Sequence, residues 1–359
     1  MADNKAKKRI LFVVEAMGGG VFTYIVDLAN ELVKTYDMYI AYAVRPQTPE
    51  NYQEYFDKRI HLVKVKNFTR SINLLKDLKA ISEVKKIAKE IRPDIIHLHS
   101  SKAGVVGRIA FSGKALRLFY TPHGYSFLME NYKPMKRRLF KFIENVMAKQ
   151  NCTTISCSPG EHQESMKLTK KAVYVNNGIN TAELDKMLEK VKNVDHPFTV
   201  FTLGRICYQK NPSLFNSIAE AMPDTRFLWI GDGELKDDLK SSNIEITGWV
   251  DREKALQLSM NADVFLLTSL WEGLPISLLE SMYMKKLCVV NDVIGNHDVI
   301  HNGENGFVCR TVDEFRIAIQ TQGVAMLTEA AFNDIETTYN TLVMGEKYAE
   351  IYEGRVPEN

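Results

Sequence analysis

The chain has 359 residues, more than one domain usually holds and enough for two cores of ordinary size. Its composition is that of a globular protein, with 45% apolar and 25% charged residues. The net charge is only +2, so the chain as a whole has no strong field to attract a nucleic acid. Any electrostatic recognition must therefore be local.

The N-terminal segment resembles neither a signal peptide nor a membrane span. The apolar run that begins at Arg9 stops at Glu15, which is shorter than either would need. The cysteines show no Cys-x-x-Cys spacing, and thiols without an export signal are typical of a reducing compartment. We therefore expect a cytoplasmic protein and disfavour a zinc site. The cysteines are Cys152, Cys157, Cys207, Cys288 and Cys309.

Short apolar runs alternate with helical patterns along the first half of the chain. The run 9–15 predicts a strand that leads into three glycines, and the spacing of apolar residues over 21–32 predicts a helix. A second helix is predicted near 72–91. Further strands are predicted at 38–44, 61–65, 93–99, 116–121, 153–157 and 172–175.

The same alternation begins again after the polar segment 193–197, where we place a domain boundary. The predicted strands of this half are 198–203, 226–230, 244–246, 264–268 and 287–291. Nearly continuous apolar strands that alternate with helices predict parallel sheets covered on both faces, with ligands at the carboxyl ends of the strands. The tail, 335–352, carries a loose helical stripe in which Gly345 would permit a bend.

The segment 271–282 is the most informative part of the chain. It follows a predicted strand, and Pro275 is suited to open a helix because its fixed φ fits a first-turn position. The N-terminus of that helix would present backbone N–H groups to an anion such as a diphosphate. The residues of this predicted anion site are Gly273, Leu274, Pro275 and Ile276.

Two glutamates belong to the same segment. Glu272 lies in the loop, and Glu280 lies about one and a half turns into the predicted helix. Carboxylates at these places can accept hydrogen bonds from the hydroxyls of a sugar and of a ribose. A capped helix with two ordinary solvated glutamates is the alternative.

Cations and glycines lie at the ends of two earlier strands. Gly204 and Arg205 follow the first strand of the second half, and Lys210 comes shortly after them. Glycine permits close approach of the backbone, while a guanidinium and an ammonium suit a pyrophosphate. A solvated pair in a surface turn is the alternative. The next strand ends in Gly231, Asp232 and Gly233, whose glycines would let the backbone pass a planar ring or a phosphate. An ordinary strand-to-helix turn is the alternative.

The joint order of these motifs is similar to that of the family 4 retaining glycosyltransferases of the GT-B fold, and the resemblance covers almost the whole chain. It implies that Arg205 and Lys210 contact the diphosphate of a nucleotide-sugar donor. It also implies that Glu272 faces the donor sugar and that Glu280 binds the ribose.

The first half of the chain agrees with this resemblance. Gly18-Gly19-Gly20 resembles the glycine loop near the donor phosphate and the acceptor, and His123 resembles the histidine that approaches the donor sugar. Asn180 replaces the usual Asp of an Asn-Gly-Ile-Asp turn. The segment 293–298 departs further, since relatives commonly have Gly-Gly followed by Pro-Glu there, so the donor-sugar preference stays open.

The resemblance implies two doubly wound, Rossmann-like α/β domains that face a cleft, with a C-terminal helix that crosses back to the N-terminal domain. We assign 1–192 to the acceptor-side domain, 193–334 to the nucleotide-sugar domain and 335–359 to the returning helix. The expected reaction is transfer of a sugar with retention, preferably from a UDP-sugar, to a saccharide or polyprenyl-linked acceptor in bacterial polysaccharide synthesis.

No Asp-x-Asp pair occurs in the chain, so the usual carboxylate clamp for a metal on a nucleotide sugar is missing. Arg205, Lys210 and helix N-termini would then stabilise the leaving diphosphate, and we expect neither a metal nor another cofactor. His97 and His99 share one face of a strand and could hold a metal. A role at the strand end or in the core is preferred because no third ligand is visible nearby.

The segment 133–149 is basic and amphipathic. A helix of this kind can lie on an anionic bilayer, which would place the protein on the cytoplasmic face of the membrane. Alternatively, its apolar stripe packs on the sheet of its own domain.

Three other classes of protein share parts of this pattern. A GT-B sugar-nucleotide epimerase would bind the same nucleotide but would need no acceptor. A two-domain solute-binding protein should carry an export signal. An NAD-dependent dehydrogenase is disfavoured because no Gly-x-Gly-x-x-Gly follows the first strand.

Overall fold

The computed structural model describes residues 6–45, 48–69, 73–112, 117–129 and 131–355. The chain forms two compact units. The first unit holds the described residues up to Leu128, Tyr132–Asn177 and those from Thr341 on. The second holds Gly178–Asn340 together with Met129 and Asn131. Each unit is a parallel sheet covered by helices, as predicted. Ile72 and Leu116, where a helix and a strand were predicted to begin, lie outside the described residues.

The sheet of the first unit has seven parallel strands in the order β3-β2-β1-β4-β5-β6-β7. The chain passes from β1 outward to β3, then returns to add β4 on the other side of β1. A reversal of this kind leaves an opening at the carboxyl ends of β1 and β4. The strands are β1 (Arg9–Met17), β2 (Asp37–Val44), β3 (His61–Lys64), β4 (Ile95–His99), β5 (Arg117–Thr121), β6 (Thr153–Ser156) and β7 (Ala172–Tyr174).

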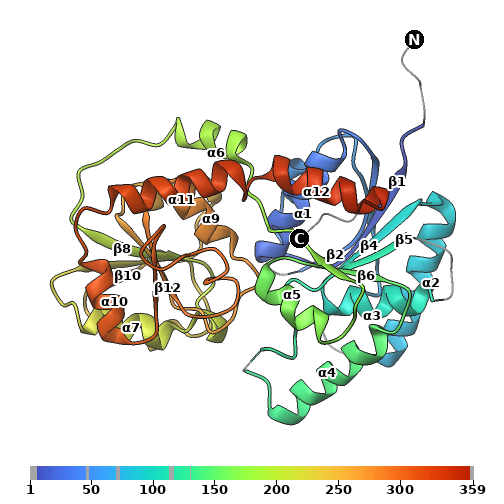
Figure 1. Cartoon of the computed structure of the whole chain (residues 1–359), viewed down its shortest axis with the longest axis horizontal. Helices are drawn as coiled ribbons and strands as arrows, with labels where there is room; N and C mark the ends of the chain where they lie inside the picture. Colours follow the sequence, from blue (N-terminus) through green and yellow to red (C-terminus); the bar gives the residue numbers. More distant parts are fainter. Residues whose placement is uncertain (1–5, 46–47, 70–72, 113–116, 130, 356–359) are drawn as a thin grey trace. The chain divides into compact units, whose positions relative to one another are not determined.

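Alternate residues of β1 enter separate cores on the two faces of this sheet. Phe12 and its even-numbered neighbours pack with α1 and α12, whereas Leu11 and Val13 pack with α2 and α3. Helix α4 lies beside α3 on this second face (Figure 1). The helices are α1 (Gly19–Leu32), 3₁₀ helix η1 (Tyr52–Tyr55), α2 (Leu74–Ile91), α3 (Ser101–Ala110), α4 (Pro134–Met147), α5 (Pro159–Met166) and α12 (Thr341–Glu353).

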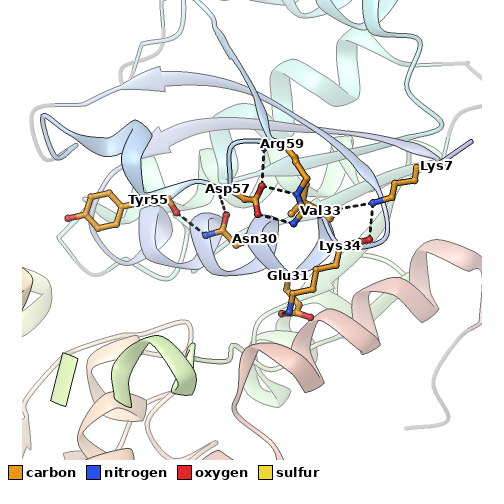
Figure 2. A network of polar contacts seen from close by, with 8 residues as sticks. All are labelled: Lys7, Asn30, Glu31, Val33, Lys34, Tyr55, Asp57 and Arg59. Atoms are coloured by element: carbon orange, nitrogen blue, oxygen red, sulfur yellow. Dashed lines mark hydrogen bonds and ion pairs between the residues drawn. The ribbon is translucent and has the colours of Figure 1, made fainter. Parts of the chain in front are cut away.

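Polar contacts fix the C-terminal end of α1 (Figure 2). The ammonium of Lys7 donates to the carbonyl of Val33 at 3.1 Å, where a cation complements the helix dipole. Asn30 donates to the carbonyl of Tyr55 and accepts from the N–H of Asp57, both at 2.8 Å. These contacts hold the helix whose other end carries the glycine loop.

The sheet of the second unit has six parallel strands in the order β10-β9-β8-β11-β12-β13. The direction of winding reverses between β8 and β11, so the loops that follow these two strands border the opening where ligands bind in such sheets. The strands are β8 (Thr199–Leu203), β9 (Arg226–Ile230), β10 (Ile244–Ile246), β11 (Val264–Leu267), β12 (Leu287–Asn291) and β13 (Phe307–Cys309). The last of these was not predicted.

The helices of the second unit cover both faces of its sheet. They are α6 (Thr181–Leu188), 3₁₀ helix η2 (Tyr208–Lys210), α7 (Pro212–Glu220), 3₁₀ helix η3 (Lys236–Asp238), α8 (Arg252–Met260), α9 (Ile276–Tyr283), α10 (Val312–Ile319) and α11 (Ala325–Thr337). Helix α6 belongs to this unit, whereas the predicted boundary at 193 lies after it. Within the described part of the chain, no helix combines the length and apolar character needed to cross a bilayer.

The C-terminal tail contains two helices where the sequence predicted one stripe. Helix α11 ends in the second unit, and α12 packs against α1 in the first, so the predicted return of the tail is confirmed. Gly345, where the sequence would permit a bend, lies inside α12. A Cβ added at Gly345 would lie 2.4 Å from the Cγ of Glu31, so the glycine serves close packing of the two helices.

Candidate functional site

Glycines at the ends of β8 and β9 allow two loops of the second unit to touch. Gly204 and Gly231 both have φ near +142°, in the region that favours glycine. A Cβ on Gly231 would lie 2.2 Å from the carbonyl oxygen of Gly204, and one on Gly233 would lie 2.1 Å from that of Ile206. The glycine pattern at these strand ends is therefore required by backbone packing, whatever ligand the loops bind.

Arg205 projects from the loop after β8 toward the loop after β9. Its Nε lies 2.9 Å from a carboxylate oxygen of Glu234, and both side chains are well exposed. An exposed pair of this kind is stabilised by less than about 1 kcal/mol. The guanidinium is thus a loosely held cation at the edge of the opening. Asp232 accepts from the N–H of its neighbour Gly233 at 2.7 Å.

Lys210 and Glu272 form an ion pair that joins the loops after β8 and β11, the two strands at the reversal point. The ammonium lies 2.7 Å from Oε1 of the carboxylate, and the side chains are 17% and 9% exposed. Gln209 donates to Oε2 of the same carboxylate at 3.3 Å. The hydroxyl of Thr268, at the end of β11, donates to the carbonyl of Lys210 at 2.8 Å. The structure therefore brings together two residues that helices α7 and α8 and strands β9, β10 and β11 separate in the sequence.

Helix α9 begins directly after this pair, at the carboxyl edge of the sheet. Pro275 is the capping residue before the helix, with φ −77° and ψ 121°, and Ile276 is the first helical residue, so the predicted first-turn position of the proline is off by one. No side chain caps this helix. Gly295, in the segment 293–298, packs on the loop, since a Cβ there would lie 2.6 Å from the carbonyl oxygen of Gly273. The divergent segment thus shapes the predicted anion site.

Glu280 lies in the second turn of α9 and is buried. Its Oε1 lies 2.7 Å from a guanidinium nitrogen of Arg252, the first residue of α8. Sequence reasoning missed this arginine. The sequence does contain a signal for it. A cation in the first turn of a helix is unfavourable with respect to the helix dipole, so a nearby anionic partner is expected.

His123 follows β5 in the first unit, in a turn that two consecutive left-handed residues form. Its φ is +54°, and that of Gly124 is +88°. Nε2 of His123 lies 3.1 Å from Nδ1 of His99, and Nδ1 lies 3.5 Å from the sulfur of Cys157. Burial lowers the pKa of His123 to about 3, so the ring is neutral at physiological pH.

A buried carboxylate holds this turn. Glu161, at the start of α5, accepts from the N–H of Gly124 at 2.7 Å and from the N–H of Cys157 at 2.7 Å. Ser158 caps the same helix by accepting from the N–H of Glu161 at 3.2 Å. One carboxylate thereby fixes the ends of both β5 and β6. Sequence reasoning missed Glu161 as well.

His97 and His99 share one face of β4, as predicted, with ring centroids 4.0 Å apart. Both rings are fully buried, and burial lowers both pKa values well below the usual one. His97 bonds to the hydroxyls of Tyr352 and Thr121 at 2.6 and 2.8 Å, which gives it a role in docking α12. Among the residues that the structure describes, no group of three or more His, Cys, Asp or Glu is placed to hold a metal ion.

The glycine loop lies at the start of α1. Gly18 is the capping residue, and Gly19, with φ +58°, begins the helix. Added Cβ atoms on Gly19 and Gly20 would meet nothing within 4 Å, so the backbone N–H groups of this turn are not crowded by side chains. An uncrowded helix N-terminus favours an anion.

The apolar residues of helix α4 were expected to pack on the sheet of its own domain or to face a membrane. Only part of them pack on the domain. Phe140, Ile143 and Met147 are half-buried, and the carboxylate of Glu144 accepts from Arg108 at 2.8 Å. A second apolar stripe faces away from the sheet with helical spacing. Its members are Met135, Leu139, Phe142 and Val146, which are 82%, 50%, 64% and 37% exposed.

Comparison with known proteins agrees with this architecture. Residues 18–183 match the model of Glycosyltransferase Family 4, and residues 197–345 match that of Glycosyl transferases group 1. An Escherichia coli relative, UDP-Gal:alpha-D-GlcNAc-diphosphoundecaprenol alpha-1,3-galactosyltransferase, is 29% identical over 83% of this chain and 85% of its own length. A Campylobacter jejuni relative, GalNAc-alpha-(1->4)-GalNAc-alpha-(1->3)-diNAcBac-PP-undecaprenol alpha-1,4-N-acetyl-D-galactosaminyltransferase, is 24% identical over 86% of this chain and 87% of its own length.

Solved structures share the fold at low sequence identity. Sucrose-phosphate synthase from Thermosynechococcus elongatus superposes with a TM-score of 0.80 at 14% identity, covering 97% of this chain and 99% of the other. Anabaena HepE, solved with UDP and glucose, gives 0.75 at 17% identity, covering 97% and 100%. The two doubly wound units with a returning C-terminal helix are thus the GT-B architecture, and the chain belongs to the family 4 glycosyltransferases.

Proposed function

We propose that this glycosyltransferase moves a sugar, with retention and without a metal, from a UDP-sugar to a lipid-linked saccharide in bacterial polysaccharide synthesis. One observation carries the donor part of this proposal. The enclosed Lys210–Glu272 pair lies at the reversal point of the second sheet, directly before the uncapped N-terminus of α9. A cation and free helix amides are what a diphosphate needs.

In the proposed mechanism, Arg205, Lys210 and the start of α9 bind the diphosphate, Glu272 faces the sugar and Glu280 accepts from the ribose hydroxyls. The bond between the anomeric carbon and the phosphate oxygen breaks as the acceptor oxygen bonds to that carbon from the same face. The acceptor proton passes to the departing phosphate oxygen. His123 is neutral, so it contributes hydrogen bonds or its peptide dipole and no proton.

The acceptor part of the proposal rests on the relatives and on α4. The names of the Escherichia coli and Campylobacter jejuni relatives specify undecaprenol-linked acceptors. The outward stripe of α4 is flanked by exposed cations, including Lys136, Arg138 and Lys141. An apolar stripe between cations fits the interface of an anionic bilayer, where it would hold the protein near a membrane-bound acceptor.

Product analysis tests the reaction. Purified protein is screened against nucleoside diphosphates by thermal shift, and the matching nucleotide sugar is then incubated with a polyprenyl diphosphate sugar. We expect one added hexose by mass spectrometry, an unchanged anomeric configuration by NMR, and full turnover in EDTA. An altered nucleotide sugar formed without acceptor would favour the epimerase instead.

Flotation tests the membrane contact. Wild-type protein should float with vesicles of phosphatidylglycerol and phosphatidylcholine at low salt and less at high salt. The variant Leu139→Ser/Phe142→Ser should stay at the bottom. The matched control is Ile317→Ser/Met326→Ser, which removes two apolar side chains of the second unit that are 62% and 83% exposed and should float like wild type. Equal flotation of all three proteins would refute the role of α4.

A further inference from the structure

Within the part of the chain that the structure describes, Arg252 forms the one ion pair of the Glu280 carboxylate. Helix α8 follows β10, so its first residue, Arg252, lies at the carboxyl edge of the sheet, as the start of α9 does. The guanidinium lies 2.7 Å from Oε1 of Glu280, and the two side chains are 32% and 8% exposed. The arginine therefore reaches from the surface into the enclosure that holds the glutamate.

The stability of α8 does not explain an arginine at this position. Asp251 already caps the helix by accepting from the N–H of Lys254 at 2.7 Å. A cation in the first turn is unfavourable with respect to the helix dipole. The pair with Glu280 offsets that cost, and it fixes one oxygen of a buried carboxylate whose other oxygen stays available to a ligand.

We propose that Arg252 is a positioning residue for nucleotide recognition: by holding Oε1 of Glu280, it aims Oε2 at the hydroxyls of the donor ribose. This inference rests on the proposed function, in which Glu280 is the ribose-binding group. A carboxylate fixed at one oxygen accepts hydrogen bonds at the other with less loss of rotamer freedom than a mobile one. Arg252 itself needs no contact with the nucleotide.

The test compares the binding of UDP and 2′-deoxy-UDP to the full chain by calorimetry. If the arginine had only a structural role, replacing it would weaken the binding of both ligands equally. Wild-type protein should prefer UDP by about 10-fold to 100-fold, the effect of one hydrogen bond to a charged group. Arg252→Met should lower this preference to within about 3-fold, and Arg252→Lys should give an intermediate value. Circular dichroism checks that each variant is folded. If Arg252→Met is not folded, the comparison is made with Arg252→Lys alone.

Two further variants separate the possible outcomes. The matched control is Arg226→Met, since Arg226 is 34% exposed and pairs with Glu245 at 2.6 Å in the same unit; it should keep the wild-type preference. Glu280→Ala should abolish the preference. If Glu280→Ala abolishes it and both Arg252 variants retain it, the inference about Arg252 is overturned while the proposed site stands. If Glu280→Ala also retains it, the ribose role of Glu280 fails, and the inference fails with it.

Discussion

Removing the ammonium of Lys210 should damage stability and activity for separable reasons. In Lys210→Met, the carboxylate of Glu272 keeps its bond from Gln209 but loses the cation 2.7 Å from Oε1. The carboxylate is 9% exposed, so water replaces the lost partner poorly. Breaking a fully buried ion pair from one side costs about 3–5 kcal/mol. Because Gln209 remains and Lys210 is partly accessible, we expect a loss of about 2 kcal/mol in the free energy of unfolding.

The double variant Lys210→Met/Glu272→Gln separates the two effects. Neutralising both partners removes the unpaired charge, so stability should return to within about 1 kcal/mol of wild type. Activity should not return, because in the proposed site Lys210 binds the departing diphosphate and Glu272 faces the sugar. We expect turnover to fall by at least about 100-fold in Lys210→Met, in Glu272→Gln and in the double variant.

Urea unfolding followed by circular dichroism measures the first quantity, and a coupled assay for released UDP measures the second. Arg226→Met/Glu245→Gln is the control, since it removes an exposed pair of the same unit and should change neither quantity. Recovery of turnover in the double variant would refute the placement of the pair at the reacting centre. Additive losses of stability would refute the assigned coupling.

Three further changes test the first unit. Glu161→Gln deprives one of two backbone N–H groups of its acceptor, so it should lower the free energy of unfolding by about 2 kcal/mol and lower turnover as well. The control is Glu314→Gln in the exposed capping box of α10, which should lower the free energy of unfolding by less than about 1 kcal/mol. Urea unfolding measures both losses of stability. Because burial lowers the pKa values of His97 and His99, the unfolded chain takes up protons below about pH 6.5 that the folded chain does not. Stability should therefore be fully present above that pH and fall by up to about 1.4 kcal/mol per pH unit per histidine as the pH drops; a flat urea midpoint between about pH 7 and about pH 5 would contradict this. Tyr352→Phe removes the hydroxyl bound to His97 and should cost about 1–2 kcal/mol in thermal unfolding, with α12 the first element to exchange amide hydrogens.

Local patterns were sufficient to predict the strands, because each is an apolar run bounded by turn residues. The predicted 226–230 and 287–291 coincide with β9 and β12. The short edge strand β13 was missed, since three residues beside a glycine turn carry too little periodicity. The break between α11 and α12 was missed for a different reason. Asn340 donates to the carbonyls of Ile335 and Glu336, and such a side-chain termination depends on a contact that the spacing of apolar residues does not encode.

The candidate site was predicted as a set of positions but not as a set of pairs. Gly204 and Gly231 were assigned to ligand approach, yet their φ values and close backbone contacts show a packing requirement that sequence motifs cannot distinguish. The partners of Glu272 and Glu280 come from other β-α segments, and a carboxylate does not reveal which distant cation will face it. Sequence alone therefore located the carboxylates and left their electrostatic state open.

That electrostatic state explains how Arg205 and Lys210, the two cations of the proposed diphosphate site, can coexist at one edge of the second sheet. Each already has a carboxylate partner, Glu234 for Arg205 and Glu272 for Lys210, so neither leaves an unpaired positive charge at the sheet edge. The two pairs differ in how readily they open. The exposed Arg205 pair can exchange its carboxylate for a diphosphate at a cost below about 1 kcal/mol, whereas the enclosed Lys210 pair is held from both sides of the opening. In the proposed reaction, Arg205 would therefore move to meet the donor, while Lys210 and Glu272 would present a preformed ammonium and carboxylate to it.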